Sequence, residues 1–452
     1  PRLIGPPELE DADRHEQKSK MEEVDVVITS YALMRRDEEI LNALELRYVI
    51  LDAAQHELGI ESLKVTERAL RHGVLYDLLG RVEHRDMRQA TVSQFVRRYH
   101  IDGAQAERVR VFALRLYDSF VPEAEDDRVD WETGVSAGSG IGGMDTIART
   151  LVPMVNEGKV RRMGSRIVEQ VMNSGTSARI AGLLALGNQV TSNSSACSTG
   201  NEAVIEAVAR IRLGLATRML AGGSEGASPY IWAGFDAMRV ICRKFNDRPE
   251  EASRPMSASA AGFVPGAGGA FLLLEELESA LTRGVRIYAE VLGGMVNCGG
   301  HRMGGTITAP NPEGVRRCVR GALADAGISP REIDAINGHL TATYADPVEV
   351  KNWSAALERG PEDFPWINST KSMIGHCLGA AGAIECVAVV LQLRDGFVHP
   401  SLNCEDLHPE IAPYEGKIPH SAVACPDLKV VAKAGFGFGD VNSCLIFRKW
   451  EQ

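Results

Sequence analysis

The sequence contains no apolar run of about 18 residues, the length that a helix needs to cross a lipid bilayer. Positive charge is also scarce. The 49 lysine and arginine residues are outnumbered by 60 aspartate and glutamate residues, and the net charge is −11 with neutral histidines. Because a protein that binds a nucleic-acid backbone needs a positive surface, this balance argues against such a function. We therefore expect neither a membrane nor a nucleic acid among the partners of this chain.

Cysteine is absent before Cys197, and the nine cysteines of the chain never form a Cys-x-x-Cys pair. This spacing supports neither a zinc site nor a disulfide framework, so no metal is expected. Free cysteines are typical of a reducing compartment, and we expect a cytoplasmic protein. No signal peptide is recognisable, and the chain begins Pro-Arg-Leu, which is what a processed or truncated product would show.

Two nucleotide-binding patterns are missing or incomplete. No Gly-x-x-x-x-Gly-Lys-Ser/Thr loop occurs, which argues against an ATP-driven motor. Residues 138–143, Gly-Ser-Gly-Ile-Gly-Gly, fit the dinucleotide pattern Gly-x-Gly-x-x-Gly, but no clear acidic partner for a ribose follows them. We therefore interpret this segment as a tight turn between a strand and a helix.

The composition changes near residue 130. Residues 1–130 are rich in arginine, glutamate and aspartate and poor in glycine. Residues 131–452 are instead rich in glycine, alanine and small polar residues. An acidic stretch at residues 122–127 predicts a solvated linker between the two parts.

In the second part, strand-like and helix-like patterns alternate, which is typical of an α/β fold. Over the whole chain, the predicted strands are residues 24–29, 48–51, 270–274, 287–292 and 333–336. The predicted helices are two within residues 92–120 and then residues 203–213, 315–326, 348–357 and 380–393. The last helix is apolar on most sides, so it should be buried.

One cysteine occupies a turn that is typical of a nucleophile. Residues 193–200, Asn-Ser-Ser-Ala-Cys-Ser-Thr-Gly, follow a strand that ends near Ser192 and precede a predicted helix. The small neighbours allow a tight turn that projects the sulfur of Cys197. Because the start of a helix favours negative charge, the pattern predicts a thiolate. The alternative is a buried structural cysteine, which is the commoner role.

Two histidines lie in loops between predicted elements. His339 follows a predicted strand, and Thr341 and Thr343 beside it offer hydroxyl groups that can orient a polar ligand. His376 precedes a glycine-rich helix, where a cation is disfavoured, so it should stay neutral and donate a ring N–H to developing negative charge. Lys371 stands among small residues before this helix, which favours a buried role over an ordinary surface charge.

Residues 435–439, Gly-Phe-Gly-Phe-Gly, alternate glycines with two aromatic side chains. The glycines allow other groups to approach the backbone closely. Alone, this pattern is typical of a core strand with glycine kinks. Together with one cysteine, two histidines and a lysine in loops at strand ends, it suits thiol-mediated acyl transfer.

These motifs, in this order, resemble the β-ketoacyl-acyl-carrier-protein synthases, condensing enzymes of the thiolase superfamily, over about residues 130–449. The similarity is to the elongating type, which has two histidines. Residues 221–225, 235–238 and 253–255 also resemble family segments. The resemblance implies a thiolase-like α/β fold with layers α-β-α-β-α. Residues 130–275 would form the N-terminal half with the nucleophile, and residues 276–452 the C-terminal half with both histidines.

What the resemblance implies is a decarboxylative Claisen condensation in fatty-acid or polyketide synthesis. Cys197 would carry the acyl chain as a thioester. His339 and His376 would stabilise the enolate that forms when malonyl-acyl-carrier protein loses CO2. Lys371 would support the histidines, and backbone N–H groups of Cys197 and Phe438 would form the oxyanion hole.

The resemblance assigns supporting roles to further residues. Thr341 and Thr343 would hold the phosphopantetheine arm, Phe436 would contact the substrate, Phe438 would also gate the pocket, and Glu349 would be a structural acid. No dissociable cofactor is implied beyond the phosphopantetheine that the carrier protein brings as substrate. The implied partners are acyl-carrier protein and a second copy of the chain in a homodimer.

Two segments depart from the family pattern. The family's His-Gly-Thr-Ser-Thr-Pro has Leu340, Ala342 and Tyr344 here in place of Gly, Ser and Pro, and Asp346 falls one residue early, so a shorter loop is expected. Residues 256–261, Met-Ser-Ala-Ser-Ala-Ala, replace a charged family segment, whose charged partners should therefore be missing.

Residues 1–129 depart most, because the family's opening strand and its Thr-Gly turn are not found there. Residues 26–31 and 48–55 resemble a Swi/Snf-type helicase fragment with Ala53 in place of the catalytic glutamate, and residues 65–81 resemble part of the exopolyphosphatases. We expect an atypical N-terminal region and a first half-domain that is incomplete or substituted. This leaves an alternative function open, a non-catalytic partner that controls chain length, although such subunits lack the nucleophile.

Overall fold

The computed structural model describes residues 3–4, 26–29, 48–51 and 129–451, and the chain divides into two compact units, residues 1–122 and 123–452. In the first unit, β1 (Leu3–Ile4), β2 (Val26–Thr29) and β3 (Tyr48–Leu51) form a parallel sheet in the order β1-β2-β3. This confirms the two strands predicted there. The predicted helices within residues 92–120 and the acidic linker lie outside the described residues.

The first sheet of the second unit has the order β5-β4-β6-β7. Its strands are β4 (Thr133–Gly138), β5 (Val190–Thr191), β6 (Arg218–Glu225) and β7 (Gly268–Glu275). β4 pairs in parallel with β5 and β6, and β7 pairs antiparallel with β6. The side chains of β4 are all buried, as expected for a parallel strand covered on both faces.

The second sheet has the order β10-β9-β13-β14-β8. Its strands are β8 (Ala289–Cys298), β9 (Ala335–Asn337), β10 (Trp366–Asn368), β13 (Val430–Gly437) and β14 (Val441–Lys449). β9 pairs in parallel with β10 and β13, whereas β14 pairs antiparallel with β13 and β8. The strands predicted at residues 270–274, 287–292 and 333–336 thus correspond to β7, β8 and β9, although β8 begins two residues late and runs to Cys298.

The two sheets share their first four positions, and the second has one strand more. β8 holds the extra position beside β14, and it comes before β9 in the chain. Its counterpart would precede β4 and pair with β7, but no strand takes that place within the described residues. β7 is accordingly only partly buried, whereas β14 is mostly buried. In the described part of the chain, the first sheet therefore has one strand fewer than the second.

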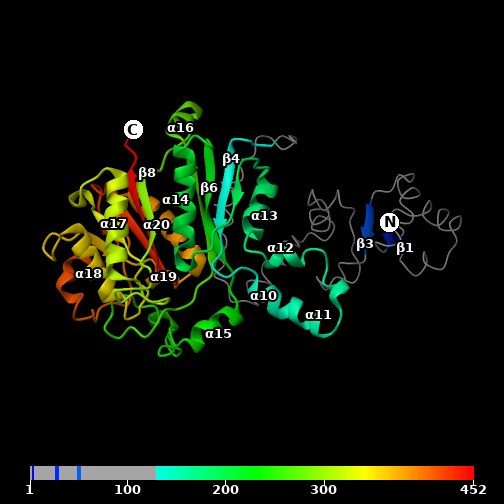
Figure 1. Ribbon diagram of the computed structural model, residues 1–452, viewed down its shortest axis with the longest axis horizontal. Coiled ribbons are helices and arrows are strands. Elements are labelled where there is room, and N and C mark those ends of the chain that lie inside the picture. Colours follow the sequence, from blue (N-terminus) through cyan, green and yellow to red (C-terminus); the bar gives the residue numbers. More distant parts are fainter. Residues whose placement is uncertain (1–2, 5–25, 30–47, 52–128, 452) are drawn as a thin grey trace. The chain divides into compact units, whose positions relative to one another are not determined.

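Helices α14 (Thr199–Arg212) and α20 (Ala381–Asp395) separate the two sheets and contact both of them (Figure 1). α13 (Gly175–Leu184) covers the outer face of the first sheet. On the second sheet, α17 (Pro312–Ala326) packs on β8 and β14, and α18 (Asp346–Leu357) packs on α17. The layers are therefore α-β-α-β-α, and the predicted helices at 203–213, 315–326, 348–357 and 380–393 are confirmed.

α20 is buried on most sides, as its composition predicted, and its apolar residues join those of α14 and both sheets in one core cluster. The shorter helices are α10 (Met144–Thr146), α11 (Val152–Asn156), α12 (Ile167–Val171), α15 (Pro229–Ala237), α16 (Leu277–Arg283) and α19 (Lys371–Ile374). Among the described residues, no helix combines the length and the apolar character that a membrane crossing needs.

Candidate active site

The cysteine turn has the geometry that the sequence predicted. It leaves the end of β5 and enters a 3-10 turn, η4 (Ala196–Ser198), that leads directly into α14. Ala196 adopts a left-handed conformation with φ of 50°, which is uncommon for a residue with a side chain and marks a tight turn. Thr199 stabilises the turn, because its hydroxyl donates to the carbonyl of Ala196 (2.7 Å) and accepts from the N–H of Ser195 (2.9 Å).

His376 lies between α19 and α20, and both its main chain and its ring are held in place. Its N–H donates to the carbonyl of Val264 (2.7 Å), and its carbonyl accepts from the N–H of Gly266 (2.8 Å). Nδ1 accepts the N–H of Leu378 (3.1 Å), so the proton of the neutral ring is on Nε2. Nε2 lies 3.1 Å from the sulfur of Cys197. His376 therefore directs its ring N–H at the sulfur, in agreement with the neutral donor predicted from the sequence.

His339 follows β9 and faces His376 edge-on, with ring centroids 5.4 Å apart. The carboxylate of Glu349 on α18 accepts the N–H groups of His339 (2.6 Å) and Leu340 (2.7 Å). The ammonium of Lys371 donates to the carbonyl of His339 (2.7 Å), although Lys371 does not itself line the pocket. The sulfur of Cys197 and a ring nitrogen of each histidine all lie within 4.8 Å of one another.

Burial controls the charge of these groups. It lowers the pKa of both histidines well below the usual range, and the positive charge of Lys371 acts in the same direction, so both rings are neutral at neutral pH. Burial raises the pKa of the Cys197 thiol to about 12, against opposing effects of Lys371 and the N–H of Phe438. Burial therefore favours a protonated sulfur in the resting site, in contrast to the thiolate that the sequence predicts. Burial also raises the pKa of Glu349 to about 7.

The loop after His339 is held by Asp346, the residue that falls one position early. Its buried carboxylate accepts the N–H groups of Thr341 (2.8 Å), Ala342 (3.0 Å) and Met256 (2.9 Å). Leu340 and Ala342 adopt positive φ values of 22° and 62°, where the family pattern has Gly and Ser. The shorter loop is thus kept in shape by hydrogen bonds to backbone N–H groups despite its backbone strain. The hydroxyls of Thr341 and Thr343 lie 3.0 Å apart and both residues line the pocket.

These groups surround a cavity of about 370 Å³. Its walls include all but one of the residues for which the sequence predicted a site role, namely Cys197, His339, Thr341, Thr343, Glu349, His376, Phe436 and Phe438. Phe436 packs against His339, with ring centroids 5.9 Å apart, and Phe438 lies against Phe235 at 6.1 Å. Tyr344 lines the cavity while 71% exposed, so it lies at the mouth.

The sequence predicted no role for three buried charged residues near the site. Glu225, at the end of β6, accepts the N–H groups of Gly140 (2.8 Å) and Gly379 (3.0 Å) and thereby joins the two half-domains. Glu385 on α20 and Lys433 on β13 form an ion pair of 2.8 Å in the interior. Each of the last two is a lone charge in a mostly apolar segment, which is a signal that a partner must exist.

Family models match most of the second unit. The model described as "Beta-ketoacyl synthase, N-terminal domain" matches residues 100–280, and "Beta-ketoacyl synthase, C-terminal domain" matches residues 288–405. The 3-oxoacyl-[acyl-carrier-protein] synthase 2 of Rhizobium meliloti is 38% identical over an alignment of 340 residues that covers 73% of this chain and 76% of that protein. The chain belongs to the β-ketoacyl synthase family.

Two further comparisons agree with this membership. The chloroplastic 3-oxoacyl-[acyl-carrier-protein] synthase I of Arabidopsis thaliana is 38% identical over 319 residues, 70% of this chain and 65% of that protein. A solved structure, a type II PKS acyl-carrier protein in complex with its ketosynthase bound to the hexaketide, is similar with a TM-score of 0.67. It is 29% identical and covers 74% of this chain and 82% of that one. The fold of this β-ketoacyl synthase is thus the thiolase-like fold that the sequence predicted.

Proposed function

We propose that this β-ketoacyl synthase is an acyltransferase that joins an acyl group on Cys197 to a malonyl group on acyl-carrier protein, with loss of CO2. The observation that carries the proposal is the convergence of one thiol and two uncharged imidazoles within 4.8 Å at one cavity. A thiol can hold an acyl group as a thioester, and uncharged imidazoles can donate N–H groups to an enolate oxygen.

In the first step, the sulfur of Cys197 attacks the carbonyl carbon of an acyl thioester on the carrier protein. The carrier thiol leaves with the proton that the Cys197 thiol loses, and the acyl group stays on Cys197. The N–H groups of Cys197 and Phe438 are the donors that we assign to the oxyanion, and the Phe438 N–H favours negative charge on the same sulfur. Nε2–H of His376, 3.1 Å from the sulfur, stabilises the thiolate as it forms.

In the second step, the malonyl thioester loses its carboxylate as CO2, and the bonding electrons remain as an enolate. His339 and His376 donate N–H groups to the enolate oxygen. The enolate carbon then attacks the thioester carbonyl on Cys197, a carbon–carbon bond forms, and the sulfur departs and takes up a proton. The ammonium of Lys371 holds His339 by donating to the backbone carbonyl of His339. Glu349 holds the same segment by accepting the backbone N–H groups of His339 and Leu340.

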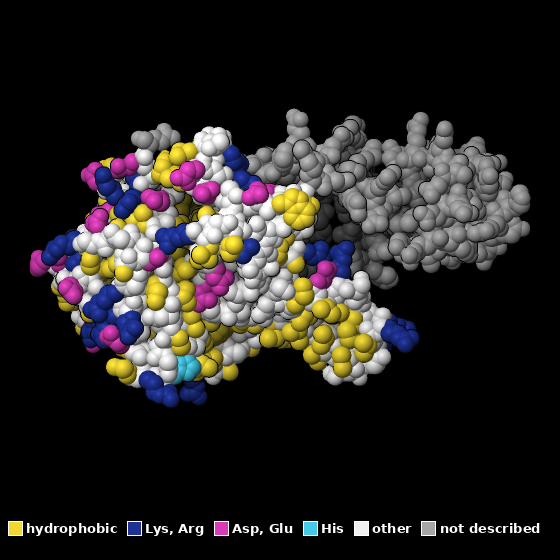
Figure 2. All heavy atoms as spheres, turned by 45° about the horizontal axis from the view of Figure 1, so that its top comes forward, with side chains coloured by type: hydrophobic (Ala, Val, Ile, Leu, Met, Phe, Trp, Pro, Cys, Tyr) yellow, Lys and Arg dark blue, Asp and Glu magenta, His cyan; other side chains and the backbone are white. Residues whose placement is uncertain are grey.

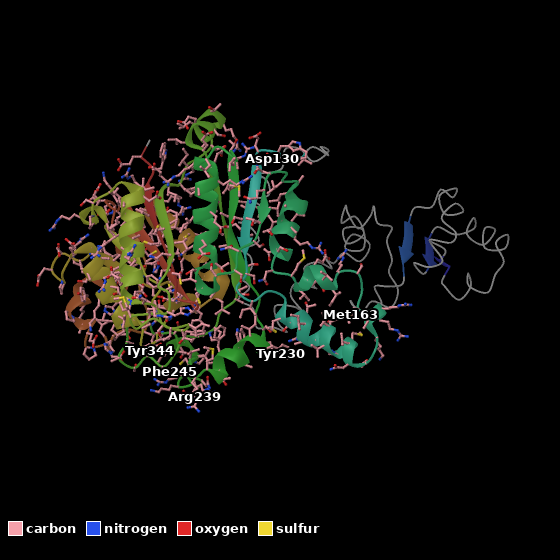
Figure 3. All side chains as sticks on the ribbon, viewed as in Figure 1. Asp130, Met163, Tyr230, Arg239, Phe245 and Tyr344 are labelled. Atoms are coloured by element: carbon pink, nitrogen blue, oxygen red, sulfur yellow. The ribbon has the colours of Figure 1, made fainter. Side chains whose placement is uncertain are left out.

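Acyl-carrier protein is the proposed partner, and its phosphopantetheine arm, which it brings as substrate, takes the place of a dissociable cofactor. Thr341 and Thr343 would hold the arm inside the cavity. At the mouth, exposed Tyr344 and Arg239 offer aromatic contact and positive charge to an anionic phosphate, and Figure 3 places both along one edge of the molecule. Arg239 stands between Met238 and Val240, which line the cavity.

The test is to incubate the purified protein with a short acyl thioester of acyl-carrier protein, with and without malonyl-acyl-carrier protein. Without malonyl substrate, we expect the intact acyl mass on a peptide that contains Cys197. With it, we expect loss of that adduct and release of a β-ketoacyl product. Folded protein that acquires no acyl mass on Cys197 would contradict the proposal. Product lengths that change only when a second ketosynthase is added would favour the non-catalytic alternative.

We also propose that the protein forms a homodimer and works in the cytoplasm. The segment that carries α11 and α12 exposes several large apolar side chains, which are Val152, Val155, Val160, Val168 and Met172. Figure 2 shows hydrophobic side chains gathered on one lobe of the molecule. Large apolar surfaces are typical of subunit contacts. All nine cysteines are free, as expected in a reducing compartment.

Sedimentation velocity tests the dimer. We expect two copies per particle and, for Val168→Asp, a dissociation constant raised by at least about tenfold, because a charge replaces an apolar contact. Leu213→Asp, which changes an exposed leucine after α14 in the same way, is the matched control and should leave the dimer intact. A monomeric wild-type protein would contradict the proposal.

A further inference from the structure

A second buried lysine lies behind the two histidines. Lys433 lies on β13, opposite Leu445 of β14 and Asn337 of β9, and its side chain is fully buried. Its Nζ lies 2.8 Å from Oε2 of Glu385 on α20, which is also buried. The other carboxylate oxygen of Glu385, Oε1, accepts a hydrogen bond from Lys371. Two ammonium groups therefore share one carboxylate in the interior.

This Lys-Glu-Lys cluster, Lys371, Glu385 and Lys433, has two positive charges and one negative charge. Charges in a protein interior are costly and are normally balanced by partners. The unbalanced positive charge lies next to the site, because Nζ of Lys371 also donates to the carbonyl of His339 (2.7 Å). After burial, Lys371 has the largest effect in lowering the pKa of both site histidines, and Lys433 acts in the same direction; His376 also lowers the pKa of His339.

The same cluster acts on the nucleophile. The positive charge of Lys371 lowers the pKa of the Cys197 thiol, whereas the negative charge of Glu385 raises it. An isolated Lys371–Glu385 ion pair would therefore have two opposing effects on this pKa. Lys433 contacts the carboxylate oxygen of Glu385 that Lys371 does not bind, so the negative charge of Glu385 faces two ammonium groups instead of one. Glu225 also acts on the thiol and raises its pKa. Members of the cluster in turn shift the pKa of the neighbouring groups Glu349, Cys377, Cys386, His399 and Cys444.

We propose that Lys433 is a positioning residue for the condensation reaction. It holds Glu385 and leaves the Lys-Glu-Lys cluster with one net positive charge, which favours the anions that form at Cys197 and in the pocket. The reaction passes through a thiolate, an oxyanion and an enolate, each of which carries one negative charge beside this cluster. The inference rests on the proposed role of Cys197 as nucleophile.

Alkylation of Cys197 by iodoacetamide tests the proposal without the condensation assay. The rate constant at Cys197 is followed by peptide mass as a function of pH in the full chain. We expect Lys433→Met to slow alkylation about tenfold at a given pH and to move the pH profile up by about one unit. Lys433→Met/Glu385→Gln removes one charge of each sign and leaves Lys371 alone with one positive charge, so it should recover the wild-type rate to within about threefold.

The matched control is Leu445→Ala, which removes packing beside Lys433 without changing any charge. It should lower the melting temperature and leave the pH profile in place. If Lys433→Met does not fold, Lys433→Gln replaces it in both comparisons. The role of Lys433 would be overturned if Lys433→Met were alkylated at Cys197 at a rate within about threefold of the wild type. It would also be overturned if Lys433→Met/Glu385→Gln were alkylated as slowly as Lys433→Met. A wild-type Cys197 that is no more reactive than the buried Cys444 would instead overturn the proposed nucleophile.

Discussion

Replacing Cys197 with alanine is expected to abolish carbon–carbon bond formation, with a loss of rate of at least about 10⁴-fold. The reason is that, in the described part of the chain, Cys197 is the one cysteine that lines the cavity with the two histidines. The protein should stay folded, because the Cys197 side chain lines a cavity and alanine fits the same turn, where Ala196 already adopts the strained backbone. The measurement is the rate of β-ketoacyl product from acyl- and malonyl-acyl-carrier protein, together with the mass of the protein after acyl loading.

The same variant separates the two half-reactions. His339 and His376 keep their positions without the sulfur, since Glu349, Val264 and Gly266 hold them through backbone contacts. CO2 release from malonyl-acyl-carrier protein should therefore persist in Cys197→Ala while condensation is lost. The matched control is Cys425→Ala, which removes a partly buried free cysteine that does not line the pocket and should keep full activity. Condensation by Cys197→Ala within about tenfold of the wild type would refute the role of this residue.

The position of the nucleophile could be predicted because it depends on local sequence. Small residues around Cys197, a strand before them and a helix after them allow only a tight turn, and the structure has that turn. The loops of His339 and His376 were predictable for the same reason, because each follows or precedes an element with a clear apolar pattern. The convergence of these loops then follows from the meeting of the two half-domains around α14 and α20.

The charge state of the site could not be predicted from local sequence. A helix start favours a thiolate, but the burial that raises the pKa of Cys197 comes from elements far away in the chain, such as β13 with Phe436. Lys433 was missed for a related reason. Its partner Glu385 lies 48 residues earlier on another element, and only the packing of α20 against β13 brings them to 2.8 Å.

The missing strand position of the first sheet could be predicted from the sequence only in part. The sequence indicated that a family strand was missing, because no Val-rich strand followed by a Thr-Gly-hydrophobic-Gly turn precedes residues 138–143. It did not indicate which position of the sheet would be affected. Within the described residues, the position that is filled in the second sheet and not in the first is the edge beside β7. That edge lies on the side opposite β4 and the nucleophile turn, so β4, β5 and the start of α14 bring the site residues together without a described strand there.

The glycine pair between α14 and α20 leads to the second large effect. A Cβ atom on Gly200 would lie 2.4 Å from the backbone nitrogen of Ala383, and one on Gly382 would lie 2.7 Å from that of Asn201. Both are closer than atoms can approach, so Gly200→Ala must push the helices apart. We expect a loss of about 2–3 kcal/mol in the free energy of unfolding, measured by denaturant titration.

Activity should fall further than stability alone explains. α14 begins two residues after Cys197, and α20 begins five residues after His376, so separating the helices lengthens the 3.1 Å contact between sulfur and Nε2. A displacement of about 1 Å at a reacting centre costs about 10²-fold in rate, and we expect at least that loss in condensation. The matched control is Gly182→Ala on α13, whose added Cβ meets nothing within 4 Å. That variant should be stabilised by about 0.5–1 kcal/mol and keep full activity, because alanine is the better helix former. A Gly200→Ala protein with the stability and the condensation rate of the wild type would contradict this prediction. It would mean that the packing of α14 against α20 does not determine the distance between the Cys197 sulfur and the His376 ring.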